Sequence, residues 1–257
     1  MRCISVINFK GGVGKSSLCI NLGHQLARLG SSTLIVDCCL QANSSTLLPT
    51  YGPPTLTQVL QGQAEFGAAV RRVREELFLL PADRDLNLAA IYISQRRSAY
   101  YTLRNAVQRI TRCEYIFFDH APGYSPVTEA ALLASQEILI PCELEPFAVQ
   151  GLFQMFHKLE ETMGDHRLIT AGIVPWAVDR RYLMSLKYQA DLKKAFGSLV
   201  LPAVRSDATF PRSQSVGQTV FEYNAKSRAA KDIRELADAL RRQQEISEQE
   251  TSEWERK

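Results

Sequence analysis

The sequence predicts an α/β fold with a mostly parallel central sheet and helices on both of its faces. Short, almost continuously apolar segments alternate along the chain with longer segments in which apolar residues recur at helical spacing. Strands that are apolar at every position are typical of a parallel sheet covered on both sides. The 257 residues, 46% hydrophobic and 22% charged, have the balance of a globular chain with one such core.

The segments predicted as strands are Cys3–Phe9, Thr33–Val36, Leu77–Leu80, Tyr115–Phe118, Ile138–Ile140, Leu168–Val174 and Leu199–Val204. Pro81 and Pro141 follow two of them, and we expect both strands to stop there because proline has no N–H for the ladder. Asp37 and Asp119 follow two others. Since the carboxyl ends of parallel strands meet at the edge where open sheets bind ligands, these two aspartates are candidate functional residues.

The segments predicted as helices are Leu18–Leu29, Leu103–Ile110, Phe147–Met163, Leu183–Phe196 and Ala229–Gln243. Gly30 stands just past the first of them, as a helix-ending glycine does. The sequence shows neither an internal repeat nor a linker, so residues 1–243 are expected to form a single domain. Residues 244–257 are polar and of mixed charge, and are expected to be a frayed tail.

The cysteines Cys3, Cys19, Cys38, Cys39, Cys113 and Cys142 form no C-x-x-C pair, which favours reduced thiols over a disulfide framework. The first residues become polar too early for a secretory signal. Apolar runs also stop short of the roughly 20 residues that a membrane span needs. We therefore expect a cytoplasmic chain without a membrane partner.

Residues 9–17 read Phe-Lys-Gly-Gly-Val-Gly-Lys-Ser-Ser and lie between a predicted strand and a predicted helix. Glycines let successive backbone N–H groups point at one anion, and the helix that follows adds its positive end. A lysine at position 15 reaches the β- and γ-phosphates, and a hydroxyl at position 16 ligates Mg²⁺. The segment predicts ATP and Mg²⁺ binding by Lys10, Gly11, Gly12, Val13, Gly14, Lys15, Ser16 and Ser17.

The form K-G-G-x-G-K-[ST] resembles the deviant phosphate loop of the ParA/MinD family of ATPases. Residues 35–45, 117–123, 138–152 and 216–236 resemble further ParA segments in the same order, so the resemblance covers roughly residues 1–240. It implies a P-loop ATPase that forms an ATP-dependent homodimer, with Lys10 reaching the phosphates of the partner. The catalytic residues it implies are Lys10, Lys15, Asp37 and Asp119, with Ser16, Asp37 and Asp119 around the metal.

This chain departs from the family pattern at position 39, where Cys39 replaces an aspartate that helps to position the attacking water. A neutral thiol is a weak hydrogen-bond acceptor and does not substitute for a carboxylate. One hypothesis is therefore that the chain binds ATP and dimerises but hydrolyses slowly. The alternative is that another group positions the water and hydrolysis is ordinary.

Residues 35–45 and 117–123 resemble the two switch segments of the family, and other residues near them carry weaker signals. The Cys38–Cys39 pair is interpreted as packing rather than redox chemistry. His120, which follows Asp119, is either a sensor of nucleotide or partner or an ordinary loop histidine. The remaining histidines, His24, His157 and His166, lack metal-ligand spacing and are interpreted as structural.

Basic residues gather in the last third of the chain, where residues 180–231 hold ten Lys/Arg against three acids. Residues 178–197 resemble a family stretch whose DNA-binding arginine falls on Arg181. At the position of a second DNA-binding arginine of the family this chain has Thr209, and Arg205 and Arg212 lie on either side of it. The residues predicted to bind DNA through phosphate neutralisation are Arg181, Arg205, Arg212, Lys226 and Arg228. The alternative is that these are solvated helix-face charges. A second basic group serves a partner, DNA or neither, and comprises Arg71, Arg72, Arg74, Arg96 and Arg97.

The expected function is that of a nucleoid-associated, ParA-like ATPase that binds duplex DNA without sequence preference and partitions a cargo with a ParB-like adaptor. A MinD-like regulator would need an amphipathic C-terminal helix, and residues 243–257 have Ile246 and Trp254 as their large apolar side chains. An iron–sulfur protein would need cysteines at cluster spacing. A non-hydrolysing scaffold remains an alternative because of Cys39.

Overall fold

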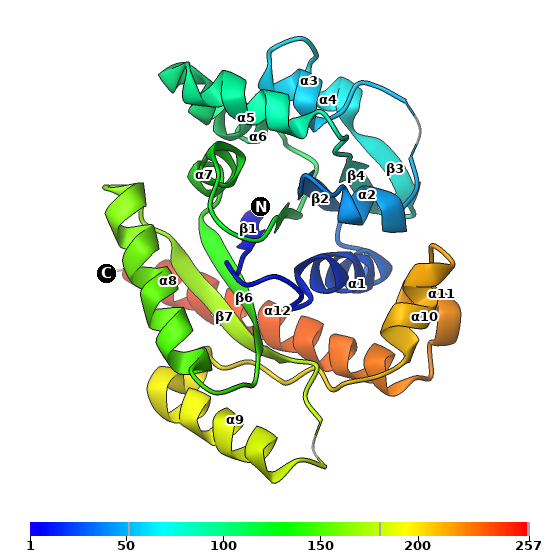
Figure 1. The fold of residues 1–257 in the computed structure, drawn as a ribbon, viewed down its shortest axis with the longest axis vertical. Helices are drawn as coiled ribbons and strands as arrows, with labels where there is room; N and C mark the ends of the chain where they lie inside the picture. Colours follow the sequence, from blue (N-terminus) through cyan, green and yellow to red (C-terminus); the bar gives the residue numbers. More distant parts are fainter. Residues whose placement is uncertain (51, 180, 256–257) are drawn as a thin grey trace.

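A computed structural model describes residues 1–50, 52–179 and 181–255, with residues 244–255 described as backbone alone. Within these residues a seven-stranded sheet has the order β3-β4-β2-β5-β1-β6-β7 (Figure 1). The strands are β1 (Arg2–Val6), β2 (Thr33–Cys38), β3 (Arg71–Arg74), β4 (Leu77–Leu80), β5 (Tyr115–His120), β6 (Glu137–Glu143) and β7 (Ile169–Trp176). The β3–β4 pair is antiparallel and the other neighbouring pairs are parallel, which confirms the predicted fold class.

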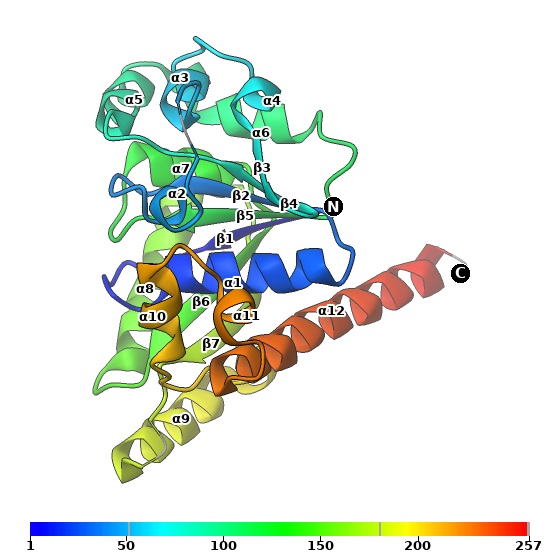
Figure 2. The same cartoon turned by 90° about the vertical axis from the view of Figure 1, so that its right-hand side faces the viewer.

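Helices cover both faces of the sheet, as Figures 1 and 2 show. One face carries α1 (Lys15–Arg28), α10 (Thr209–Ser215), α11 (Val220–Asn224) and α12 (Arg228–Glu255). The opposite face carries α3 (Leu56–Leu60), α5 (Leu86–Ser94), α6 (Thr102–Val107) and α7 (Pro126–Leu133). The β6–β7 end is covered by α8 (Ala148–Met163) and α9 (Leu183–Phe196).

Shorter elements connect these layers. They are α2 (Asn43–Leu47), α4 (Phe66–Ala69) and two 3₁₀ turns, η1 (Arg97–Tyr101) and η2 (Gly197–Leu199). The helices predicted from the sequence are present. The first begins at Lys15 instead of Leu18, α6 ends at Val107 instead of Ile110, and the last, predicted to end at Gln243, continues to Glu255. The first strand ends at Val6, so Phe9 belongs to the loop that follows.

Alternation along β2 and β5 decides on which side of the sheet each functional residue lies. Every residue of both strands is buried because helices cover both faces. Ile35 and Phe117 pack in the core beneath α1, whereas Phe118 packs in the core beneath α7. Since successive strand residues point to opposite faces, Asp119 lies on the α1 side and His120 on the α7 side.

Pro141 does not end its strand, contrary to the prediction. β6 continues to Glu143, and Pro141 pairs with Val174 of β7. The Pro141 carbonyl accepts a hydrogen bond from the Asn8 amide, on the side of β6 where β1 has already ended. The proline nitrogen therefore lies on the β1 side, just past the last bond of that pair, from the Ile7 N–H to the Leu139 carbonyl, and leaves the pairing of β6 with β7 intact.

The predicted strand Leu199–Val204 was wrong. This segment meets the sheet at isolated bridges, Ile173 with Val200 and Val178 with Arg205, and is otherwise irregular. Pro202 cannot donate to a ladder, which limits pairing along the segment. The antiparallel edge strand β3, which is rich in arginine, was missed because its sequence lacks an apolar strand pattern.

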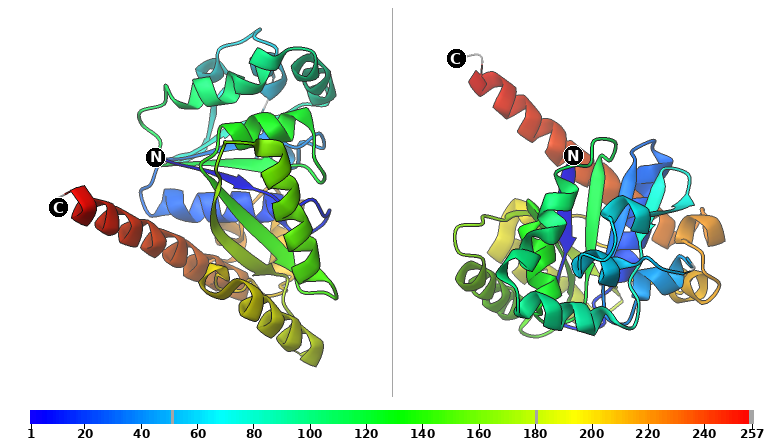
Figure 3. Two further views of the ribbon diagram at one scale, coloured as in Figure 1. Left: turned by 90° about the vertical axis from the view of Figure 1, so that its left-hand side faces the viewer. Right: turned by 90° about the horizontal axis from the view of Figure 1, so that it is seen from above.

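The prediction that residues 244–257 form a frayed tail stays a prediction. α12 runs from Arg228 to Glu255 without a break, and its end stands away from the sheet (Figure 3). Residues 256–257 lie outside the described residues. Within the described part of the chain, no helix combines the length and the apolar character that a membrane crossing requires.

Candidate nucleotide-binding site

The phosphate loop joins the carboxyl end of β1 to the first turn of α1, at the centre of the sheet. Gly12 and Gly14 have φ angles of 77° and 84°, a conformation that side chains disfavour. At Gly14 a Cβ would lie 2.1 Å from the indole nitrogen of Trp176, so this glycine is required by packing as well. The loop thus has the tight, glycine-dependent curl that turns backbone N–H groups toward an anion.

Lys15 is folded over the phosphate loop. Its side chain is buried, and its Nζ donates to the carbonyls of Asn8 and Lys10 at 2.9 and 2.8 Å. Burial lowers the pKa of this amine, while the nearby charge of Asp119 raises it. The Lys15 ammonium is hydrogen-bonded to uncharged carbonyls and lines a cavity, so a phosphate group there would supply the negative charge that this buried cation lacks.

Lys10 points away from its own loop. Its Nζ donates to Glu143 at 2.8 Å and to Glu145 at 2.6 Å, just beyond the end of β6. These hydrogen bonds raise the pKa of Lys10. The side chain is partly exposed, so it stands at the surface and not over the phosphate loop.

Asp37 and Asp119 lie opposite each other on adjacent strands, and both are fully buried. Burial raises the pKa of Asp119 to about 6. The pKa of Asp37 rises to about 7 because of burial and then because of the charge of Asp119. Two buried carboxylates this close are stable as anions only when a positive charge compensates them.

The surroundings of Asp119 fit a bound Mg²⁺. Its Oδ2 accepts from the Ser44 hydroxyl at 2.6 Å, and the nearby Ser16 lowers the pKa of this carboxyl. Its Oδ1 is buried and has no hydrogen-bond partner among the described residues. A carboxylate oxygen left free beside a serine hydroxyl is a donor set that Mg²⁺ accepts.

Both carboxylate oxygens of Asp37 accept hydrogen bonds, unlike those of Asp119. Its oxygens accept from the Cys39 N–H at 3.0 Å and from the backbone and hydroxyl of Ser45 at 2.8 and 2.7 Å. Asp37 thereby holds the turn that leads into α2. Its predicted role at the metal stays a prediction.

Cys39 lies in the turn that Asp37 holds. Its thiol is buried and accepts a 3.6 Å hydrogen bond from the Asn43 amide. Burial raises the pKa of the thiol, so it is neutral at physiological pH. The sulfur therefore provides no anionic acceptor at this position.

A cavity of about 590 Å³ opens beside the phosphate loop. Its lining residues are Gly12, Val13, Gly14, Lys15, Ser16, Ser17, Gln41, Asn43, Thr46, Leu47, His120, Pro122 and Gln214. It therefore combines the loop, both switch segments and α10. Its volume lies in the range of small-molecule sites.

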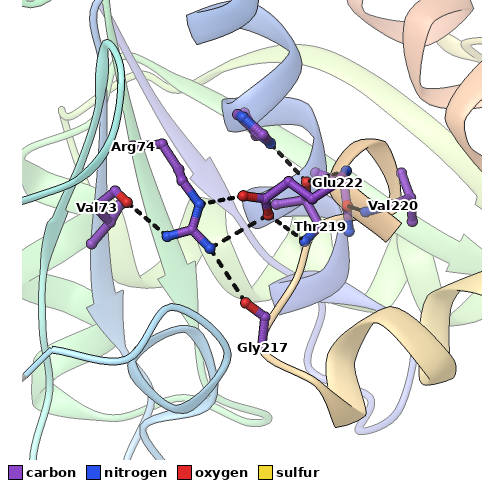
Figure 4. Close-up of polar contacts among 8 residues, drawn as sticks. Val73, Arg74, Gly217, Thr219, Val220 and Glu222 are labelled. Carbon is purple, nitrogen blue, oxygen red and sulfur yellow. Dashed lines mark hydrogen bonds and ion pairs between the residues drawn. The ribbon is translucent and has the colours of Figure 1, made fainter. Parts of the chain in front are cut away.

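Sequence reasoning missed the wall formed by α10 and α11. Three α1 residues spaced along one helix face hold this wall by hydrogen bonds: Ser17 with Gln214, Asn21 with the Val220 N–H, and His24 with Thr219. Figure 4 shows the outer layer of the same contact, in which Arg74 of β3 bonds to Glu222 and to the Gly217 carbonyl. The prediction that His24 is structural is confirmed, but its partners are about two hundred residues away in sequence.

The basic residues predicted to bind DNA fall into two groups. Arg181 is 85% exposed and pairs with Asp179 at 2.5 Å. This contact lowers the pKa of Asp179 to about 2, with a smaller effect from the charge of Arg228. Lys226 and Arg228 are exposed as well, with Arg228 bonded to the Ser206 carbonyl.

Arg205 is held by a buried partner. Its guanidinium forms a forked ion pair with Asp232 of α12, whose side chain is only 2% exposed. This arrangement disfavours a contact between Arg205 and DNA. Arg212 is exposed on α10, the helix whose Gln214 lines the nucleotide cavity.

The second basic group is divided between structural and surface positions. Arg74 forms the ion pair with Glu222, and Arg71 donates to the Ala68 and Pro54 carbonyls. Arg96 stacks on Tyr92, whereas Arg97 is exposed.

Comparisons with known proteins agree with this geometry. A family model described as an AAA domain matches residues 1–168. The chromosome partitioning protein ParA of Caulobacter vibrioides is 33% identical over 247 residues, which cover 92% of each chain. The chain belongs to the ParA family of partitioning ATPases. Another ParA-family relative, the chromosome-partitioning ATPase Soj of Thermus thermophilus, is 32% identical over 93% of this chain and 95% of its own.

Solved structures place this ParA-family chain in the P-loop ATPase fold. McdA of Cyanothece with ATP superimposes with a TM-score of 0.82 at 21% identity, covering 93% of this chain and 96% of its own. MinD of Pyrococcus horikoshii with Mg-ADP gives 0.78 at 22% identity, covering 92% and 94%. Cobyrinic acid a,c-diamide synthase of Mycobacterium smegmatis, with an ATP analogue and magnesium, gives 0.81 at 26% identity, covering 95% and 96%.

Proposed function

We propose that this ParA-family chain binds ATP and Mg²⁺, forms an ATP-dependent homodimer, and binds duplex DNA without sequence preference to partition a cargo with a ParB-like adaptor. Residues 1–243 would form the single ATPase domain, and the protein would be cytoplasmic and nucleoid-associated. Nucleotide and Mg²⁺ binding is supported by the phosphate loop beside a 590 Å³ cavity and by the free oxygen of Asp119.

The observation that carries the dimer is the direction of Lys10. This lysine does not line the cavity of its own phosphate loop, and its ammonium lies at the surface between Glu143 and Glu145. A phosphate on a second subunit would compete with these carboxylates for the ammonium. Exposed ion pairs of this kind are weak, so the exchange has a low energetic cost.

Exposed arginines support the proposed binding to DNA, because guanidinium groups pair with phosphates. Arg181 extends from the loop between β7 and α9, and its ion-pair partner Asp179 is itself at the surface. Joining two subunits places two copies of this surface on one particle, which raises the effective concentration of the second contact. Binding to DNA would therefore depend on ATP.

The deciding experiment measures binding to random-sequence duplex DNA with ATP–Mg²⁺, with ADP–Mg²⁺ and without nucleotide, across a salt series. We expect binding with ATP–Mg²⁺ that weakens steeply with salt, because counterions are released. Arg181→Ala should weaken binding and flatten the salt slope, whereas Arg97→Ala, at another exposed arginine, should change neither.

A positioning ATPase anchored by a protein is the second candidate. Beside Arg181, the exposed side chains of Tyr182, Leu183 and Met184 form an apolar surface, with Leu183 at 82% exposure. Such a patch is typical of a protein contact. Absence of DNA binding in every nucleotide state would favour this candidate and contradict the first.

A further inference from the structure

His120 is the last residue of β5 and follows Asp119 directly. It pairs in register with Cys38 of β2, next to Cys39, where the carboxylate is missing. The residue is 1% exposed and lines the nucleotide cavity. It therefore lies where the two switch segments meet.

A chain of hydrogen bonds fixes the tautomer of this histidine. The Ser135 hydroxyl donates to the Ala131 carbonyl at 2.9 Å, so it accepts from the Ser5 hydroxyl at 2.8 Å. The Ser5 proton is thereby used, and Ser5 Oγ accepts from His120 Nε2 at 2.7 Å. Since Nε2 carries the proton, the Nδ1 of the neutral ring has a free lone pair.

That lone pair has no donor among the described residues, although Nδ1 is fully buried. A buried acceptor without a donor is costly and is rarely left so in a native structure. A hydroxyl or water that arrives with the nucleotide is the simplest group that satisfies it.

The carboxylates and the thiol around this position are occupied or unsuitable, although the side-chain amides of Gln41 and Asn43 also line the cavity. Asp37 is used by Cys39 N–H and by Ser45. The Cys39 thiol is a weak acceptor already bonded to Asn43. The free oxygen of Asp119 lies on the opposite face of the sheet from the His120 side chain, with the candidate cation ligands.

We propose that His120 Nδ1 accepts a hydrogen bond from the water that attacks the terminal phosphate, and so supplies the orientation that Cys39 does not. The inference rests on the hydrolysis of ATP, which we propose for this chain together with the function above. The water oxygen bonds to the γ-phosphorus as the bond to the bridging oxygen breaks and ADP leaves. One water proton stays on the phosphate product and the other passes to solvent, so His120 holds the water without taking its proton.

Two substitutions distinguish the roles of the two ring nitrogens of His120. The side-chain oxygen of His120→Asn occupies the place of Nδ1, whereas the amide of His120→Gln reaches the place of Nε2. Phosphate release with Mg-ATP gives kcat and KM, and thermal unfolding shows that each variant is folded. We expect His120→Gln to lower kcat roughly 10- to 100-fold with KM unchanged, and His120→Asn to stay within about threefold of the parent chain.

His157→Gln is the matched control, because His157 is an exposed histidine on α8 that faces Glu161, outside the nucleotide cavity. It should retain kcat within about threefold. Equal losses of kcat in His120→Asn and His120→Gln would overturn the proposal and leave His120 a structural role. Normal kcat in His120→Gln would also overturn it, with ATP hydrolysis intact. A parent chain that binds Mg-ATP but releases no phosphate would refute the proposed hydrolysis together with this role.

Discussion

The ion pair between Arg205 and Asp232 makes a quantitative prediction that separates stability from DNA binding. The Asp232 carboxylate is 2% exposed and accepts from the guanidinium and from the Arg205 backbone N–H at 2.9 Å. Replacing the arginine by Arg205→Met leaves this buried carboxylate with the backbone contact alone. Removal of one partner from a fully buried pair costs about 3–5 kcal/mol.

Partial exposure reduces that figure. The Arg205 side chain is 25% exposed, so water compensates part of the lost contact and we expect about 2–3 kcal/mol. For a chain of this size the loss corresponds to a decrease in Tm of roughly 4–12 °C. The double variant Arg205→Met, Asp232→Leu should recover much of it, because no buried charge is then left unpaired.

Scanning calorimetry of the two single variants and the double variant tests this reasoning. The same proteins are assayed for DNA binding below their unfolding temperature, where Arg205→Met should bind as the parent chain does. An unchanged Tm in Arg205→Met, together with lost DNA binding, would refute the structural assignment and restore Arg205 to the DNA surface.

Three further predictions concern the phosphate loop, pH and the switch. Gly14→Ala should prevent ATP binding and lower Tm, because its Cβ would lie 2.1 Å from Trp176. Gly12→Ala has open space around it and should cost only about 1 kcal/mol of backbone strain. Equal Tm values for the two variants would contradict this prediction. His24 has its pKa lowered to about 4 by burial, so its stabilisation is complete above pH 6.5 and is lost as the pH falls toward 4. Between pH 7.5 and pH 5, the free energy of unfolding measured in urea should fall by about 2 kcal/mol less in His24→Asn than in the parent chain. An identical fall in both proteins would exclude His24 as the cause of this pH dependence. Cys39→Asp should raise the rate of phosphate release while Cys39→Ser does not, and an unchanged or lower rate in Cys39→Asp would favour ordinary hydrolysis in the parent chain.

Local spacing predicted the sheet class, the phosphate loop and the two strand-end aspartates well, because these depend on neighbouring residues. Contacts between distant segments escaped it. Arg205 was assigned to DNA because its partner Asp232 lies on α12 and is not visible as a neighbour in sequence. The wall that Gln214 contributes to the cavity depends on a contact with Ser17.

Irregular segments were predicted least well. An arginine-rich edge strand such as β3 has no apolar periodicity, and it forms because β4 offers a free edge. Pro141 was expected to end a strand, but pairing with β7 carries β6 past it to Glu143. In each case a neighbouring strand, and not the residue itself, decides the outcome.

The position of β1 has a consequence for synthesis on the ribosome. β1 is made first, yet it pairs with β5 and β6 and not with β2. Its apolar residues therefore have no sheet partner until β5 has been made, and they lack the second partner until the chain has grown past Glu143. Arg2 also donates to the Leu240 carbonyl, near the other end of the chain. Because domains emerge from their N-terminus, β1 gains both neighbouring strands only once residue 143 has been made, and the cavity gains its Gln214 wall later still.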